Sequence, residues 1–163
     1  GAIGLARCLH GLGDLCRAQK DFEGAADWFA RSVEICERTG DAHLLMEGYL
    51  EWAQVLIMLG RPEAEAEPLI RKGMALAEEM AAAGGVSSIQ SQCSALGRAF
   101  HQQGNVPRAL YFFEKSFDFG ENPTAEITLS AMRPLYEQEG RLADFAEFCA
   151  RVGHAPPLAA TAQ

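Results

Sequence analysis

The stretch that decides the fold is LGDLCRAQKDFEGAADWFARSV at residues 12–33, which returns in altered form as LGRAFHQQGNVPRALYFFEKSF at residues 96–117. In both segments a Leu-Gly pair is followed by a polar turn. A small residue, Ala25 or Ala109, comes next, with a phenylalanine four positions later. Internal repetition of this kind indicates supersecondary units that stack on one another.

Weaker versions of the same pattern run over residues 52–74 and 132–149. The turn falls at residues 20, 60, 104 and 140, so that successive spacings are 40, 44 and 36 residues. We therefore predict four copies, at residues 3–39, 42–83, 87–119 and 123–152.

Each copy places small residues opposite large ones. Gly13, Ala53 and Gly97 occupy the position where a neighbouring helix must approach closely. Alternation of small and large residues lets two antiparallel helices pack at about 8–10 Å. Because one helix pair cannot bury both of its apolar faces, further pairs must stack on it.

The residues that begin and end helices agree with this pattern. Asp21, Asp41, Asn105 and Asn122 stand where N-caps are expected, and Gly40, Gly60, Gly104, Gly120 and Gly140 stand where helices end. We predict an all-α fold of about eight helices, at residues 3–19, 22–39, 42–59, 62–83, 87–103, 106–119, 123–139 and 141–152. No run alternates with period two, so strands are not expected, and residues 153–163 are predicted to be a disordered tail.

Composition narrows the classes of function. The 163 residues include 14 Lys and Arg against 22 Asp and Glu, a formal charge of −8, and 48% are hydrophobic. This composition favours a folded protein and argues against nucleic-acid binding, which needs a surplus of positive charge. The most apolar run, residues 52–59, is too short to span a bilayer, so no membrane association is expected. The start lacks a signal peptide and an initiator Met, and we expect part of a longer protein.

Five cysteines occur at irregular spacing with no Cys-x-x-Cys pair. This pattern is typical of small buried residues in a cytoplasmic protein, not of a disulfide framework. Cys8, His10 and Cys16 resemble half of a zinc site, but no fourth ligand stands at metal-site spacing. We predict neither a metal nor a cofactor.

The four copies resemble the tetratricopeptide repeat (TPR) family over roughly residues 5–150. The matching residues are Leu12-Gly13, Phe22, Ala25 and Phe29 in the first copy, Tyr49, Trp52 and Ala66 in the second, and Leu96-Gly97, Gly104, Ala109 and Phe113 in the third. The spacings exceed the ~34 residues of the standard unit, which suggests a longer-repeat variant. The resemblance implies helix hairpins stacked into a right-handed superhelix that forms a single domain over residues 1–152. Pro134 and Phe145 depart from the pattern, and we expect a kinked or shortened helix at Pro134.

The resemblance further implies a concave groove lined by the first helix of each pair. The residues that map to it are Arg7, His10, Asp14, Arg17, Glu47, Leu50, Gln54, Met58, Ser94, Arg98, His101 and Gln102. Some TPR proteins clamp the C-terminal carboxylate of heat-shock chaperones with Lys, Arg and Asn. Here Asp14 stands where that clamp has an asparagine, and its carboxylate would repel the ligand. Arg7, Arg17 and Arg98 either pair with an acidic peptide or are solvated surface charges.

No catalytic motif accompanies these features. The sequence contains no Gly-x-Ser-x-Gly elbow, no phosphate-binding loop and no His-Glu-x-x-His helix. We therefore predict a non-enzymatic scaffold or adaptor that binds a peptide or helix of a partner protein in its groove. The alternative is a sensor or regulatory arm of a larger signalling or transcription-regulating protein, which would contact a neighbouring domain of the same chain. Self-association through the exposed ends of the array is a further expectation.

Overall fold

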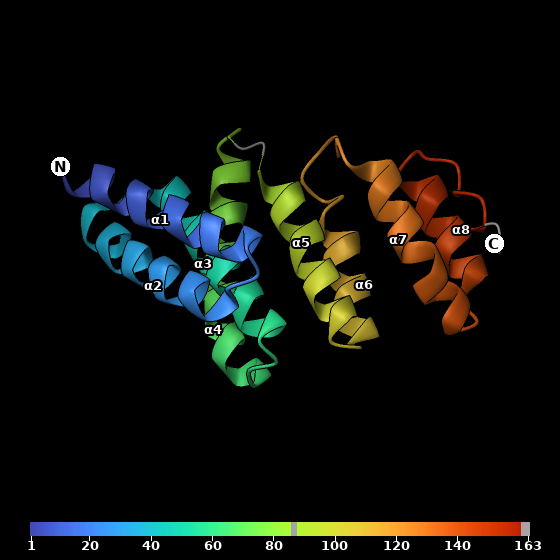
Figure 1. Ribbon diagram of the computed structural model, residues 1–163. Coiled ribbons are helices and arrows are strands. Elements are labelled where there is room, and N and C mark those ends of the chain that lie inside the picture. The colour runs from blue at the N-terminus through green and yellow to red at the C-terminus, as the bar shows by residue number, and fades with distance from the viewer. Residues whose placement is uncertain (86–87, 161–163) are drawn as a thin grey trace. The chain divides into compact units, whose positions relative to one another are not determined.

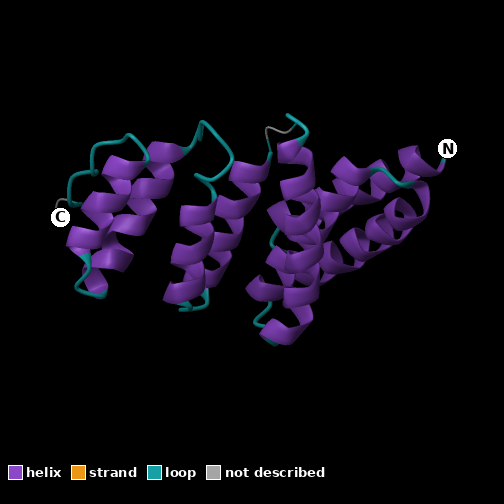
Figure 2. Ribbon diagram, turned by 180° about the vertical axis from the view of Figure 1, so that it is seen from behind, coloured by secondary structure: helices purple, strands orange, loops and turns teal. Residues whose placement is uncertain are grey.

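The computed structural model describes residues 1–85 and 88–160, which form eight α-helices and no β-strand (Figure 1, Figure 2). The helices are α1 (Ala2–Ala18), α2 (Phe22–Thr39), α3 (Ala42–Met58), α4 (Glu63–Ala82), α5 (Ile89–Gln102), α6 (Val106–Lys115), α7 (Ala125–Gln138) and α8 (Leu142–Arg151). Each of them overlaps one range predicted from the sequence. The all-α repeat fold is therefore confirmed.

Three of the four predicted N-caps are confirmed. Asp21 accepts a hydrogen bond from the backbone N–H of Gly24, and Asp41 and Asn105 do the same at the starts of α3 and α6. The fourth, Asn122, is wrong, because α7 begins three residues later. Its side chain instead accepts from the Thr124 N–H and donates to the hydroxyl of Ser116. Such local side-chain bonds compete with helix formation.

The loop between α6 and α7, which contains Asn122, explains why α6 is shorter than predicted. The helix ends at Lys115 instead of continuing to residue 119. Ser116 follows it fully buried, with its hydroxyl donating to the carbonyl of Phe113 at 2.6 Å. Gln90 of α5 donates to the carbonyls of Phe119 and Glu121, so the loop is held by hydrogen bonds from outside it.

The helices form two compact units. The first contains α1 to α4 together with Gln102–Gly104, the last residue of α5 and the two that follow it, and the second contains the rest of α5 with α6 to α8. In the first unit α2 packs against α1 and α3, and α3 packs against α4. In the second, α7 packs against α6 and α8. Within each unit the second helix of one copy thus packs on the first helix of the next.

The predicted alternation of small and large residues is confirmed in the first and third copies. A Cβ atom placed on Gly13 would lie 2.6 Å from the ring of Phe29, and one on Gly97 would lie 2.6 Å from the ring of Phe113. Both phenylalanines are buried. Each glycine therefore lets the two helices of one hairpin approach at a phenylalanine sixteen residues further along the chain.

We expect the substitution Gly97→Ala to destabilise the second unit by about 1–2 kcal/mol. Overpacking against the Phe113 ring costs about 1–3 kcal/mol, which outweighs the gain of about 1 kcal/mol from replacing a helical glycine. Urea denaturation followed by circular dichroism measures the change. Gly11→Ala is the matched control, because a Cβ there has no neighbour within 4 Å, and it should stabilise. Equal effects from the two substitutions would contradict the packing argument.

The fourth copy departs from the expected geometry in one respect. Pro134 is exposed, and α7 continues through it to Gln138. Both α7 and α5 have 14 residues, so the proline does not shorten the helix relative to α5. Phe145 occupies the position of the small residue and is buried, with its ring 5.3 Å from that of Tyr136.

Residues 153–160 follow α8 without forming a helix. Arg133 of α7 donates to the carbonyl of Pro157 at 2.9 Å. Residues 161–163 of the predicted tail lie outside the described residues, as does residue 87, where the third copy was predicted to begin. The disorder predicted for the tail and the boundaries of the four copies stay predictions.

Candidate functional site

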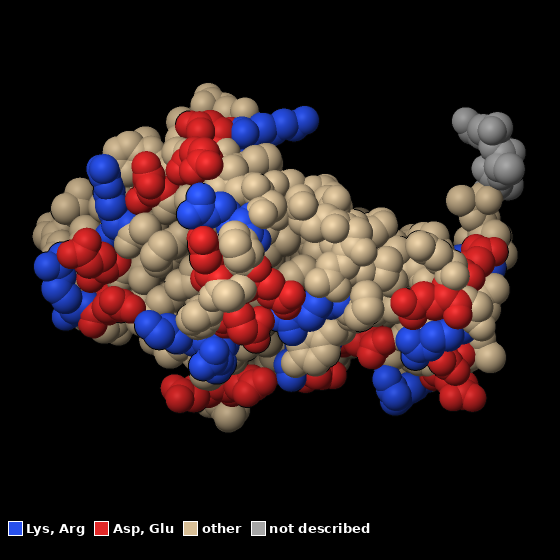
Figure 3. Space-filling view, turned by 90° about the horizontal axis from the view of Figure 1, so that it is seen from below, with Lys and Arg blue, Asp and Glu red and all other residues tan. Residues whose placement is uncertain are grey.

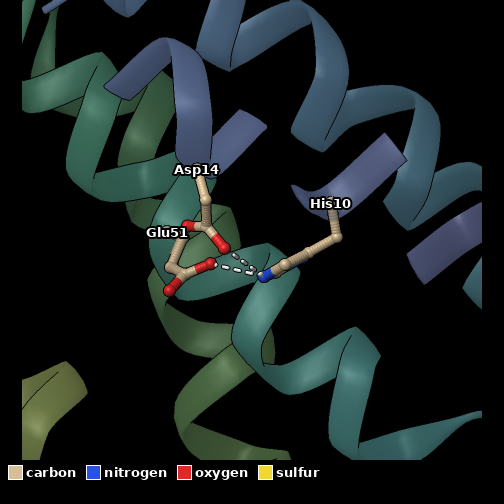
Figure 4. A group of neighbouring side chains, drawn as sticks. All are labelled: His10, Asp14 and Glu51. Atoms are coloured by element: carbon tan, nitrogen blue, oxygen red, sulfur yellow. Dashed lines mark ion pairs between the residues drawn. The ribbon is translucent and has the colours of Figure 1, made fainter. Parts of the chain in front are cut away.

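Polar side chains from two different repeats meet in the first unit. Arg7, His10, Asp14 and Arg17 follow one side of α1, as the helical spacing predicted. They face α3, and Figure 4 shows His10 and Asp14 pointing toward Glu51 of α3. The structure therefore brings the first predicted set of groove residues together with the second helix that was expected to line the groove.

His10 and Glu51 form the centre of this cluster. The His10 Nε2 atom lies 2.7 Å from Glu51 Oε2 and 3.8 Å from Asp14 Oδ2. The side chains of His10 and Glu51 are both about nine-tenths buried. The other ring nitrogen of His10, Nδ1, is buried without a hydrogen-bond partner among the described residues.

Arg17 closes the cluster on one side. Its guanidinium donates to Asp14 Oδ1 at 2.7 Å and to Gln54 Oε1 at 2.9 Å. It also lies 3.5 Å from Glu51 Oε1. A single cation therefore links both carboxylates of the cluster and a neutral acceptor on α3. The sequence left Arg17 either as a partner for an acidic peptide or as a solvated surface charge, and the structure pairs it within the chain.

The electrostatics favour a protonated His10. Burial lowers the pKa of His10, but its hydrogen bond to Glu51 and the charges of Glu51, Asp14 and Glu47 outweigh it, so that its pKa lies above the ordinary value. Burial and the charge of Glu51 also raise the pKa of Asp14, although Arg17 and His10 act in the opposite direction. The cluster thus retains protons more readily than the isolated side chains would.

A cavity of about 480 Å³ adjoins the cluster. It is lined by Arg7, His10, Gly11, Asp14, Asp41, His43, Leu44 and Glu47. Arg7 lies 3.5 Å from Asp41, and His43 lies 3.6 Å from Glu47. Asp14, Asp41 and Glu47 line the cavity together with Arg7 and the protonated His10, so the carboxylates exceed these two cations by one charge.

His10, Asp14 and Glu51 could in principle hold a metal ion, since one donor atom from each lies within 4.8 Å of the others. Imidazole and carboxylate ligands suit a divalent transition metal. However, Arg17 contacts both carboxylates and a protonated His10 contacts Glu51, so the charges already balance. We interpret the cluster as an ion-pair network. Of the cysteines considered from the sequence as half of a zinc site, Cys8 is exposed and Cys16 packs against a hydrophobic cluster.

Several other predicted groove residues lie elsewhere. Leu50 is fully buried, and a Cβ on Gly73 of α4 would lie 2.6 Å from it. Ser94 is buried, with its hydroxyl 3.1 Å from that of Thr128. Neither can line a groove, because each is enclosed between helices. The rest of the set comprises Met58, half-buried at the end of α3, and Arg98, His101 and Gln102, exposed on α5.

Glu51 was missed by the sequence analysis. It lies four residues after Glu47 and three before Gln54, which places it on the same side of α3 as both. It directly precedes the apolar run of residues 52–59, and the sequence analysis treated that segment by its hydrophobicity alone. A carboxylate on the polar stripe of an otherwise apolar helix is the feature that could have identified it.

The charges on one face of the described residues do not indicate a second site. On the face drawn in Figure 3, acidic and basic side chains are intermixed, and neither sign forms a continuous patch. Elsewhere in the described residues, charged side chains form ion pairs one helical turn apart, such as Arg38 with Glu34 and Arg61 with Glu65. None of the helices in the part of the chain that the structure describes is long and apolar enough to cross a bilayer.

Comparisons with known proteins agree with the repeat pattern. Residues 5–39 match the family model of the tetratricopeptide repeat. The fold is similar to a crystal structure of nearly identical TPR-like repeats from a Podosopora anserina protein described as a kinesin light chain. The TM-score is 0.65 at 18% identity, over 93% of this chain and 74% of that one. A point variant of the same repeats gives the same values. No curated protein matches the sequence. The predicted resemblance to TPR repeats is thereby confirmed.

Proposed function

We propose that this chain is a protein-interaction module whose cavity between α1 and α3 receives a Lys or Arg side chain from a segment of a partner protein. TPR repeats generally mediate protein–protein interactions. The observation that carries the proposal is the cavity itself, in which Asp14, Asp41 and Glu47 outnumber Arg7 and the protonated His10. A partner's ammonium or guanidinium group there would make charge-assisted hydrogen bonds.

The contacts that Arg7 and Arg17 make within the chain favour a basic partner over the acidic peptide considered from the sequence. Arg17 is held by Asp14 and Gln54, and Arg7 lies beside Asp41. An acidic group that took Arg17 would compete with Asp14 and Gln54, which already accept from it. The cavity carboxylates have two oxygens each and can accept further hydrogen bonds from a basic side chain beside those they already accept. Because the surrounding network is preformed, little ordering would be needed on binding.

A peptide-display selection tests this function. We expect the peptides enriched on the purified chain to contain Lys or Arg, and Glu47→Lys to weaken their binding at least tenfold. Glu47 is half-buried beside His43 at the cavity, so the substitution reverses the local charge without entering the core. Glu137→Lys, at an exposed position in the second unit, is the matched control. Enrichment of acidic peptides, or equal affinity for both variants, would refute the proposal.

A regulatory arm with a small-molecule ligand is the second candidate. The volume of the cavity, about 480 Å³, falls within the range of roughly 300–1,000 Å³ that small-molecule sites occupy. A ligand that binds only the native state raises the melting temperature. A thermal-shift screen of metabolites would support this candidate if a hit were lost in Glu47→Lys and retained in Glu137→Lys. Both candidates are non-enzymatic, and for both we propose a cytoplasmic location.

A further inference from the structure

A groove runs between α2 and α4 over one side of α3. Two adjoining cavities of about 400 and 450 Å³ form it, and both are lined by Ala30, Trp52 and Leu69. At about 100° per residue, the residues of α3 in this α2–α4 groove lie roughly opposite the polar stripe that carries Glu51. All the lining residues belong to the first unit. The groove is therefore a second surface of that unit, separate from the cavity between α1 and α3.

The floor of the α2–α4 groove is apolar. Trp52, Leu56 and Leu59 of α3 recur at intervals of four and three residues, and all three are half-buried. Ala26 and Ala30 line the groove from α2, and their short side chains leave space beside these larger residues. Large apolar side chains that stay partly exposed in a hollow are typical of a protein-binding surface.

The rim of the groove is acidic at one end. Glu23, Asp27, Arg61 and Glu65 line this end, and Arg61 pairs with Glu65 at 3.0 Å. Glu23 and Asp27 are exposed one helical turn apart on α2, and neither forms an ion pair with another described residue. Glu23 lies in the first turn of α2, where the helix dipole favours its charge. Asp27 lies beyond that turn, so the helix dipole does not account for it.

The charges at the other end of the groove are balanced. Arg31, Glu34, Glu37 and Lys72 line this end. Lys72 lies 3.7 Å from Glu37 and 5.3 Å from the centre of the Tyr49 ring. Two cations thus accompany two carboxylates. The difference between the ends gives the groove a direction, with its unpaired negative charge beside the first half of α2.

We propose that the α2–α4 groove binds a segment of a partner protein whose large apolar side chains pack on Trp52 and Leu56 and whose Lys or Arg lies beside Asp27. The apolar floor provides the contact, and the charges at the rim select the occupant. An acidic segment would be repelled by Asp27, and an uncharged one would cover this carboxylate without pairing it, at a cost in free energy. A second copy of the chain is disfavoured by its net charge of −8. The proposal goes beyond the cavity between α1 and α3 and does not depend on it.

A peptide-display selection on the Glu47→Lys variant tests the proposal. In this variant the charge at the cavity between α1 and α3 is reversed, and the α2–α4 groove is unchanged. We expect the enriched peptides to carry Leu, Phe or Met close to a Lys or Arg. Adding Asp27→Lys should weaken their binding about fivefold, and less at high salt. Adding Ala30→Leu should weaken it about tenfold or more, because the longer side chain fills the groove where its two cavities meet.

Matched control variants separate the groove from net charge and from helix propensity. Glu137→Lys changes the net charge as Asp27→Lys does, and Ala146→Leu makes the same substitution as Ala30→Leu at an exposed helical alanine of the second unit. Both should leave the affinity unchanged. Circular dichroism should show that every variant keeps its helical content. Equal affinities for Asp27→Lys and Glu137→Lys, or for Ala30→Leu and Ala146→Leu, would overturn the proposal.

Tryptophan fluorescence locates the contact. The sequence contains two tryptophans, so Trp28→Phe leaves Trp52 as the single reporter, at the floor of the groove. An enriched peptide that lacks tryptophan should shift the emission to shorter wavelength, because it removes water from the half-buried indole. Unchanged emission at saturation, or a selection that enriches no basic apolar peptide, would refute the proposal. An emission that shifts when the chain alone is diluted would assign the groove to a second copy, and would refute it as well.

Discussion

Replacing Phe29 with alanine is expected to lower the free energy of unfolding of the first unit by about 3–5 kcal/mol, the usual cost of removing a buried phenylalanine. The ring has no exposed surface and fills the space that Gly13 leaves on α1. It also packs with Ala26 and Val55, and therefore joins α1, α2 and α3. No single neighbour can move into the cavity that the substitution leaves, because the surrounding residues come from three helices.

Chemical denaturation followed by circular dichroism measures this loss. Tyr111→Ala is a suitable comparison, since Tyr111 is a large aromatic residue that is 52% exposed, and its replacement should cost less than about 1 kcal/mol. The ring of Phe29 also lies 5.2 Å from that of His10. Phe29→Ala should therefore alter the chemical shifts of His10 in NMR spectra as well. A cost no larger than that of Tyr111→Ala would show that the hairpin does not depend on this contact.

The packing of the hairpins could be predicted because it is local in the sequence. Gly13 and Phe29 are sixteen residues apart, as are Gly97 and Phe113, and both pairs recur at the same positions of the repeat. Helical periodicity was enough to place Arg7, His10, Asp14 and Arg17 on one side of one helix. The loop after α6 could not be predicted in the same way. The residue at which α6 ends and this loop begins depends on hydrogen bonds of Ser116 and Asn122. Helix propensity does not reveal these bonds.

The centre of the candidate site could not be predicted, because its contacts join different repeats. His10 and Glu51 are 41 residues apart, and their contact follows from the way α3 packs beside α1. From the sequence, Arg17 was either a cation that pairs with an acidic peptide or a solvated surface charge. The structure satisfies it with Asp14 and Gln54. A helical stripe therefore predicts which residues share a face, but not which of them bind one another.

Replacing Glu51 with alanine is expected to destabilise the first unit by about 3 kcal/mol near pH 6. Glu51 lies 2.7 Å from His10 and 3.5 Å from Arg17, with only 9% of its side chain exposed. Removing one partner of a buried ion pair leaves the other charge uncompensated, at a typical cost of 3–5 kcal/mol. We expect a value at the lower end, because Arg17 is 30% exposed and can reach water.

The pH dependence separates the charge of Glu51 from its packing. The pKa of His10 in the folded chain lies above its ordinary value of 6.5. Its protonated form therefore contributes stability that is complete below pH 6.5 and is lost as the pH rises through the folded pKa. Urea denaturation of wild type and Glu51→Ala should show a smaller difference at about pH 8.5 than at about pH 6. Glu34→Ala breaks an exposed ion pair with Arg38, and should cost less than about 1 kcal/mol at both pH values. If Glu51→Ala instead costs the same at both, its effect arises from lost packing and His10 is not held protonated by Glu51.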